Sequence, residues 1–136
     1  MTPEEIRIAI TTYLDASWGT STLITIKYPN VDFAAPKAES WLEMDILMGE
    51  SFVKELGPRG IGLRTGSVLF SIYTPPNTGV KTANLFADVL EEMFAREDVD
   101  GVVFDEPSTR YLGVDASNYF HTAVTIPFNC WVGENR

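Results

Sequence analysis

Three long stretches of the chain alternate apolar and polar residues with a period of two. They cover residues 41–48, 62–73 and 118–128, and in each one face carries a run of large apolar or β-branched side chains, while the polar side chains are mostly on the other face. This is the pattern of a strand that buries one side against a core. Each stretch is therefore predicted to form a strand, and Pro127 indicates a strand end or a sheet edge at the close of the last one.

Shorter β-rich stretches occupy residues 22–27, 102–104 and 108–114, and we predict further strands there. Residues 49–60 contain Gly57 and Pro58, so they read as an extended excursion between two strands. Residues 97–101 combine acidic residues with a glycine and are interpreted as a turn.

Two segments repeat apolar residues at helical spacing. The first, residues 3–16, opens with Thr2, Pro3 and Glu5, which are the residues of a capped helix start. The second, residues 80–96, follows Thr78 as its cap. Its apolar arc spans more than half of the circumference, more than one sheet face can cover. Either the first helix or another subunit must therefore cover the remainder.

This order of elements predicts the fold class. Helix, strands, helix and strands in succession favour an α+β domain, with a mixed, largely antiparallel sheet of about five to six strands and two main helices packed on one face. A length of 136 residues is enough for one core. We therefore expect a single domain over residues 1–136.

The charge balance restricts the kinds of partner. Acidic residues outnumber basic ones by 19 to 10, the net charge is -9, and the basic residues are scattered from Arg7 to Arg136. Nucleic-acid binding requires clustered positive charge, so it is disfavoured, whereas an acidic surface would let DNA slide past. The N-terminal residues lack the basic region of a secretory signal, and no apolar run approaches the ~18 residues of a membrane span. No membrane partner is predicted.

Few residues suggest catalytic chemistry. Glu43 and Asp45 share one strand face at a spacing of ~7 Å, which could serve metal binding or acid-base work, although alternate charges usually mark a solvated face. His121 alternates with apolar neighbours, which favours a packing or solvent-facing role. Cys130, the only cysteine, excludes an intramolecular disulfide and is interpreted as a small apolar residue. We predict no catalytic, cofactor or metal residues.

Two glycine-containing segments resemble ligand loops only in part. Residues 98–101 look like part of a calcium loop, but that alignment puts Arg96 at the first ligand position and Pro107 at the last. Residues 57–62 are glycine-rich but lack the Lys-Ser/Thr ending and the helix of a phosphate cradle. Neither segment predicts a cofactor.

Several short segments recur in a characteristic order along the chain. They are Trp41 at a strand start, Arg59-Gly60 at a loop end, Tyr73-Thr74-Pro75 at a strand end, Asn77-Thr78-Gly79 before a helix, Met93-Phe94, and the closing run Tyr119 to Phe128. In this order the chain resembles the bacteriophage tail terminator family, from about Pro3 to Phe128.

The resemblance implies a structural virion protein and no enzyme. Such proteins form a ring, commonly a hexamer, that caps the tail tube, stops its polymerisation and offers a docking surface to the head. The implied partners are further copies of the chain, the tail tube protein, a head-completion or connector protein, and DNA that passes through the lumen unbound. Location at the head-proximal end of the tail is implied. The candidate subunit or tube contacts are Phe52, Lys54, Glu55, Arg59, Leu85 and Val89.

Other functions remain open at the level of sequence. A head-tail joining protein or a tail tube protein would share the same class. A small hydrolase would use Glu43, Asp45 or His121. A regulatory domain would bind a basic partner through its acidic surface, in a salt-sensitive manner.

Overall fold

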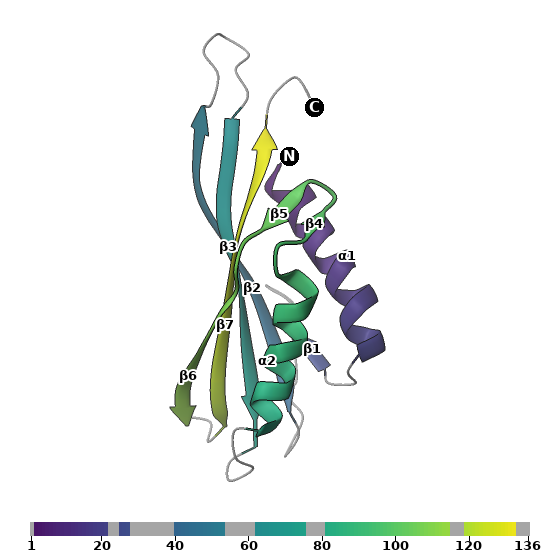
Figure 1. Cartoon of the computed structure of the whole chain (residues 1–136), viewed down its shortest axis with the longest axis vertical. Coiled ribbons are helices and arrows are strands. Elements are labelled where there is room, and N and C mark those ends of the chain that lie inside the picture. The colour runs from purple at the N-terminus through teal and green to yellow at the C-terminus, as the bar shows by residue number, and fades with distance from the viewer. Residues whose placement is uncertain are drawn as a thin grey trace.

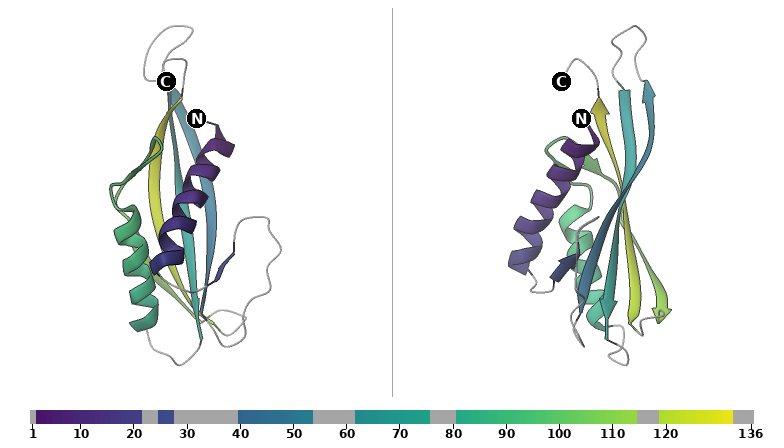
Figure 2. Two further views of the ribbon diagram at one scale, coloured as in Figure 1. Left: turned by 90° about the vertical axis from the view of Figure 1, so that its right-hand side faces the viewer. Right: turned by 180° about the vertical axis from the view of Figure 1, so that it is seen from behind.

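The computed structural model describes residues 2–21, 25–27, 40–53, 62–75, 81–114 and 119–132. Two helices lie on one face of a strongly twisted sheet (Figure 1, Figure 2). The elements are α1 (Pro3–Ser21), β1 (Thr25–Lys27), β2 (Trp41–Val53), β3 (Gly62–Thr74), α2 (Lys81–Phe94), β4 (Asp98–Val99), β5 (Val102–Phe104), β6 (Ser108–Val114) and β7 (Phe120–Val132).

The sheet has seven strands in the order β1-β2-β3-β7-β5-β4, and β6 pairs with β7 beside β5. All pairs are antiparallel except β1 with β2. The predicted α+β class, with a largely antiparallel sheet and both helices on one face, is confirmed. The strand beyond the expected number is the two-residue β4, which lies within the segment interpreted as a turn.

The core lies between the sheet and the helices. On the sheet, Met44, Phe70 and Val124 stand side by side on neighbouring strands, and all are buried. From α1, the buried residues Ile6, Ile10, Leu14 and Trp18 follow one stripe of the helix.

The two helices also contact each other. The ring of Trp18 lies 5.9 Å from that of Phe86, and the hydroxyl of Tyr13 donates a hydrogen bond to the Met93 carbonyl at 2.6 Å. The sequence left two candidates to cover the wide apolar arc of α2, the first helix and another subunit. The first helix contacts this arc.

Several element ends differ from the prediction. α1 continues to Ser21 rather than ending at Ala16, because Trp18 is a buried part of its stripe. α2 ends at Phe94 rather than at Arg96, whose φ of 58° is incompatible with a continued helix.

The long strands are longer than predicted. β2 runs to Val53 across an irregularity between Met48 and Ser51, so residues 49–53 are strand and the excursion predicted there is wrong. Residues 54–60 lie outside the described residues. β7 continues to Val132 rather than ending at Phe128. Of the strand predicted at residues 22–27, the described part, 25–27, is β1.

Pro127 lies within β7 and not at a strand end or a sheet edge, so that prediction is wrong. The Pro127 carbonyl accepts a hydrogen bond from the Asp105 amide at 2.9 Å. In an antiparallel strand the nitrogen and the carbonyl of one residue point to the same side. The missing amide hydrogen therefore faces the crossover between β5 and β6, where no ladder bond is required, and β3 pairs on the other side.

The turn predicted at residues 97–101 is confirmed as the connection of the β4–β5 hairpin. Val99 pairs with Val102, and the two residues between them, Asp100 and Gly101, have φ values of 51° and 94°. Positive φ at both positions is typical of two-residue hairpin turns. The Asp98 carboxylate accepts a hydrogen bond from the Gly101 amide at 2.9 Å, which fixes the turn further.

Candidate functional site

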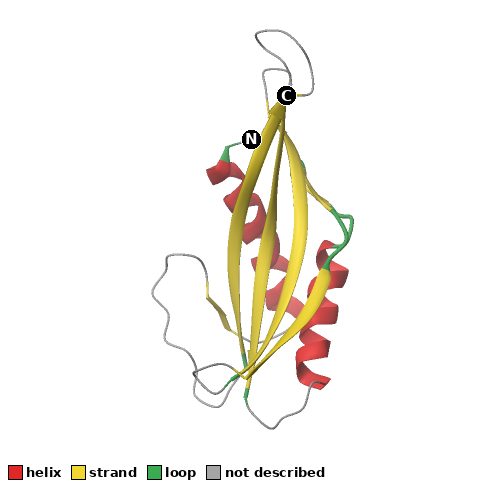
Figure 3. Cartoon of the chain, turned by 90° about the vertical axis from the view of Figure 1, so that its left-hand side faces the viewer, coloured by secondary structure: helices red, strands yellow, loops and turns green. Residues whose placement is uncertain are grey.

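One face of the sheet is not covered by either helix (Figure 3). We call it the uncovered face and define it by the alternate residues of β2, β3 and β7 that point away from the core. Of its described side chains, the charged ones are Glu43 and Asp45, both acidic. The remaining described side chains of this face are uncharged or, in the case of His121, an imidazole, and most of them are small or apolar. They are Trp41, Leu47, Leu63, Thr65, Ser67, Leu69, Ser71, Tyr73, His121, Ala123, Thr125, Pro127 and Asn129.

Three planar rings stack across this face. Trp41, Tyr73 and His121 are paired in register on adjacent strands. Ring centroids are 4.1 Å apart for Trp41 and Tyr73 and 4.6 Å apart for Tyr73 and His121, with interplanar angles of 16° and 18°. The packing interpretation of His121 therefore agrees with its position.

The stack also separates the groups that a hydrolase would need. Tyr73 lies between the strand of Glu43 and the strand of His121, and its hydroxyl donates a hydrogen bond to Glu43 Oε1 at 3.2 Å. Alternate strands of a sheet are about 10 Å apart, beyond hydrogen-bond reach. Glu43, Asp45 and His121 thus share one face without converging. Among the described residues, no group of His, Cys, Asp or Glu could hold a metal ion.

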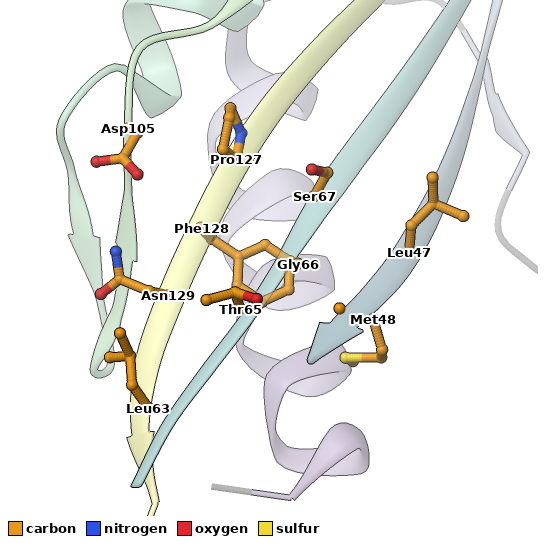
Figure 4. A pocket seen from close by; sticks show the side chains of 11 residues that line it. Leu47, Met48, Leu63, Thr65, Gly66, Ser67, Asp105, Pro127, Phe128 and Asn129 are labelled. Atoms are coloured by element: carbon orange, nitrogen blue, oxygen red, sulfur yellow. The ribbon is translucent and has the colours of Figure 1, made fainter. Parts of the chain in front are cut away.

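The uncovered face contains an open depression with a volume of about 450 Å³ (Figure 4). Leu47 from β2 and Asn129 from β7 lie on opposite sides of it, and Asp105 is its single charged lining residue. Gly66 lies at its centre, and a Cβ there would come within 2.6 Å of Phe128 Cζ and of the Leu47 carbonyl. Without a second titratable group, this lining offers no acid-base pair.

Exposed apolar side chains gather at two opposite edges of the sheet. On β2, Leu47 is 54% exposed and Met48 38%. On β6, Tyr111 is 50%, Leu112 47% and Val114 60% exposed. Because β3 and β7 lie between β2 and β6, these two groups are separated by two strands. Two separate apolar edges are typical of a protein that contacts other protein surfaces.

The predicted contact residues are distributed over several regions. Leu85 is 55% exposed on α2, whereas Val89 is half-buried against the core. Phe52 pairs with Leu63 within β2 and β3. Lys54, Glu55 and Arg59 lie outside the described residues. The contact role of all six residues stays a prediction.

The β6 edge was not identified from the sequence. All residues of β6 except Gly113 are exposed. A signal was available, because Tyr111 and Leu112 are consecutive apolar residues in a segment without alternation. Such a run is unusual in a half-buried strand.

Cys130 is a free, buried cysteine on the core side of β7. Burial raises the pKa of its thiol, an effect that the positive charge of Arg64 only partly opposes. A protonated, enclosed thiol is a poor nucleophile. Its position agrees with the interpretation of Cys130 as a small apolar residue.

Comparisons with known proteins and solved structures identify the family to which this chain belongs. No curated protein matches the chain, and no helix within the described ranges is long and apolar enough to cross a membrane. Among the solved structures that match, one is similar with a TM-score of 0.71 over 96% of both chains, at 15% sequence identity. That likeness concerns the fold alone. The family model for phage tail terminator proteins matches residues 5–128, which confirms the resemblance seen in the sequence, and the chain belongs to the phage tail terminator protein family.

Proposed function

We propose that this protein forms a ring that caps the phage tail tube, stops its polymerisation and provides the surface to which the head docks. The observation that carries the proposal is the match of residues 5–128 to the terminator family, a family of structural phage proteins. Nearly the whole domain matches. We therefore assign the function to the whole domain rather than to one motif.

The two apolar edges support assembly into a ring. A cyclic ring joins two different surfaces of each subunit, because every copy meets one neighbour on each side. The edges at β2 and β6 differ in sequence and lie on opposite sides of the sheet. This is the arrangement that a closed, head-to-tail contact requires.

The uncovered face supports the passage of DNA. The described charges that β2, β3 and β7 place on that face, Glu43 and Asp45, are acidic. Arg110 of β6 projects on the same side, but the whole chain carries a net charge of -9. A like-charged wall disfavours adsorption of the phosphate backbone. If the uncovered face lines the lumen, the helices lie on the outside of the ring.

Contacts with the tail tube and the head are assigned to the predicted residues. Leu85 offers exposed apolar surface on α2, on the helix side of the sheet. Phe52, Lys54, Glu55 and Arg59 follow one another at and beyond the end of β2. Alanine at Phe52 or Arg59 is expected to weaken ring formation or docking without loss of the fold.

The test measures mass and tube length. Light scattering of the purified protein, alone and with tail tubes of the same phage, should reveal a species of ring size. Electron microscopy should show that tubes polymerised with the protein are shorter and capped at one end. A head-tail joining protein would leave tube length unchanged, and a tube protein would itself polymerise. A chain that stays monomeric with and without tubes would contradict the proposal.

A further inference from the structure

We propose that the ring closes edge to edge: Leu112 on β6 of one copy seats in the groove between α1 and β2 of the next copy, and Arg110 of the first copy faces Asp45 of the second. This inference rests on the proposed ring and specifies the surfaces that form it. The occupant of the groove is a second copy of this chain.

The β6 edge presents a protruding apolar side chain. β6 pairs with β7, and the register shifts between Tyr111 and Gly113, so that Leu112 is the unpaired residue of a bulge. It is 47% exposed. The strand beneath it is fixed, because Tyr111 donates a hydrogen bond to Asn84 and Thr109 donates one to Glu91, both on α2. Leu112 is thus an exposed apolar side chain on a strand that hydrogen bonds to α2 hold in place.

The β2 edge contains a groove that can receive such a side chain. β1 pairs with only residues 41–43 of β2, so the strand beyond Glu43 has no described neighbour on that side. There, the start of α1 and β2 enclose a groove of about 260 Å³. Pro3, Ile46 and Met48 supply its apolar lining, and Glu4, Arg7 and Asp45 supply its polar lining.

The charges at the two edges are complementary. Arg7 is already occupied, because its guanidinium donates hydrogen bonds of 2.8 and 2.6 Å to the Glu4 carboxylate. Asp45 is exposed and forms no salt bridge with the described residues, and the same holds for Arg110. Within the described part of the chain, one edge therefore carries a carboxylate and the other a guanidinium that take part in no salt bridge, although Asp45 Oδ1 accepts a hydrogen bond from the Ile46 amide at 3.0 Å.

Both charges also project from the same side of the sheet. Asp45 pairs with Leu69, and Arg110 pairs with Ala123, so both lie in register with residues of the uncovered face. When two sheets stand side by side with their uncovered faces on the same side, Arg110 of one and Asp45 of the other meet on that side. An exposed ion pair contributes little affinity, so the apolar contact stabilises the interface and the charges determine which edges meet.

The test uses two charge-reversal variants, Arg110→Asp and Asp45→Arg. Each variant alone places like charges at every interface, and we expect the protein concentration needed for half-assembly to rise by roughly tenfold or more. Mixed together, the two variants can alternate around a ring of even subunit number, and every interface then pairs opposite charges. Native mass spectrometry should therefore show rings restored in the mixture, with equal numbers of the two variants.

Matched controls separate this contact from other effects. Glu92→Arg reverses another exposed carboxylate, on α2 at the position opposite the buried stripe, and should assemble like the parent protein. Leu112→Ala should weaken assembly. Thermal unfolding of every variant confirms that it folds.

The outcomes distinguish the contact from the ring itself. The edge contact is wrong if the parent protein forms rings and both single reversals assemble as well as the parent. It is also wrong if mixing the two variants does not restore ring formation. In both cases the proposed ring itself is not contradicted. A Leu112→Ala variant that assembles as well as the parent protein would likewise overturn the inference. If the parent protein forms no ring alone or on tail tubes, both the proposed function and this contact fail.

Discussion

Two leucines on α2 show how burial separates structural from surface roles at the level of single residues. Leu90 is fully buried, whereas Leu85 is 55% exposed. We expect Leu90→Ala to lower the free energy of unfolding by about 2–5 kcal/mol, because it leaves a cavity in the core. Leu85→Ala, the matched control, should change it by less than about 0.5 kcal/mol. Urea denaturation measures both, and equal losses would contradict the assigned burial.

The buried thiol of Cys130 predicts a pH dependence. Burial raises its pKa in the folded protein, while the unfolded chain ionises near the ordinary value of about 8.5. The folded state therefore favours the protonated thiol. Its contribution to stability is complete below that pH and is lost as the pH rises toward the folded pKa.

Two measurements check the prediction for Cys130. A thiol reagent should react slowly with the native protein and rapidly in denaturant. Between pH 8 and 10, the free energy of unfolding should fall more steeply for the parent protein than for Cys130→Ala, which lacks the titrating group. Rapid labelling of the native protein at neutral pH would show that the thiol is accessible.

At the scale of elements, the start of α1 is fixed by a reciprocal pair of hydrogen bonds. The Thr2 amide donates to Glu5 Oε1 at 2.8 Å, and the Glu5 amide donates to Thr2 Oγ1 at 3.2 Å. Thr2→Ala should lower the free energy of unfolding by ~1 kcal/mol and speed amide exchange in the first turn. Thr12→Ala, at an exposed position within the helix, is the control and should not destabilise. Unchanged exchange in Thr2→Ala would show that the cap is not needed.

The elements that the sequence predicted well are those defined by local patterns. The period of two between Trp41 and Met48 and the capping residues Thr2 and Glu5 depend only on near neighbours. The errors arose where a distant partner decides the structure. Trp18 prolongs α1 because it packs on Phe86, and Pro127 is tolerated inside β7 because of the crossover between β5 and β6.

The candidate contact surfaces were less predictable for the same reason. The exposure of Leu112 depends on a bulge in the pairing of β6 with β7, and sequence alone does not show that pairing. The exposure of Leu47 depends on its position on the sheet face that neither helix covers. Leu85, in contrast, could be predicted from helical periodicity, because it lies at the margin of the apolar arc of the second helix.

At the scale of the whole molecule, the sign of charge on the uncovered face is expected to control contact with DNA. Thr125→Lys places a positive charge on that face from β7, where Thr125 pairs with Leu69 of β3. We expect rings to form normally but to retain duplex DNA in a filter-binding assay, and the retention should fall as salt is added.

The control for this experiment places the same charge elsewhere. Glu92→Lys adds a lysine on the opposite, helix side of the molecule and removes an acidic group as well. If the uncovered face lines the channel, DNA threaded through rings should be retained by Thr125→Lys and much less by Glu92→Lys. Equal retention would show that net charge, rather than the position of the charge, is responsible.

Pro127 marks the point on one flank of β7 where the ladder with β5 gives way to the ladder with β6. On this flank, residue 127 accepts a hydrogen bond from the Asp105 amide but has no amide hydrogen to donate. The row of hydrogen bonds is therefore thinnest between the β4–β5 hairpin and β6, while the pairing with β3 is continuous on the other flank. A load that a neighbour places on β6 would accordingly reach the hairpin mainly through β7 and β3, and much less along the flank itself.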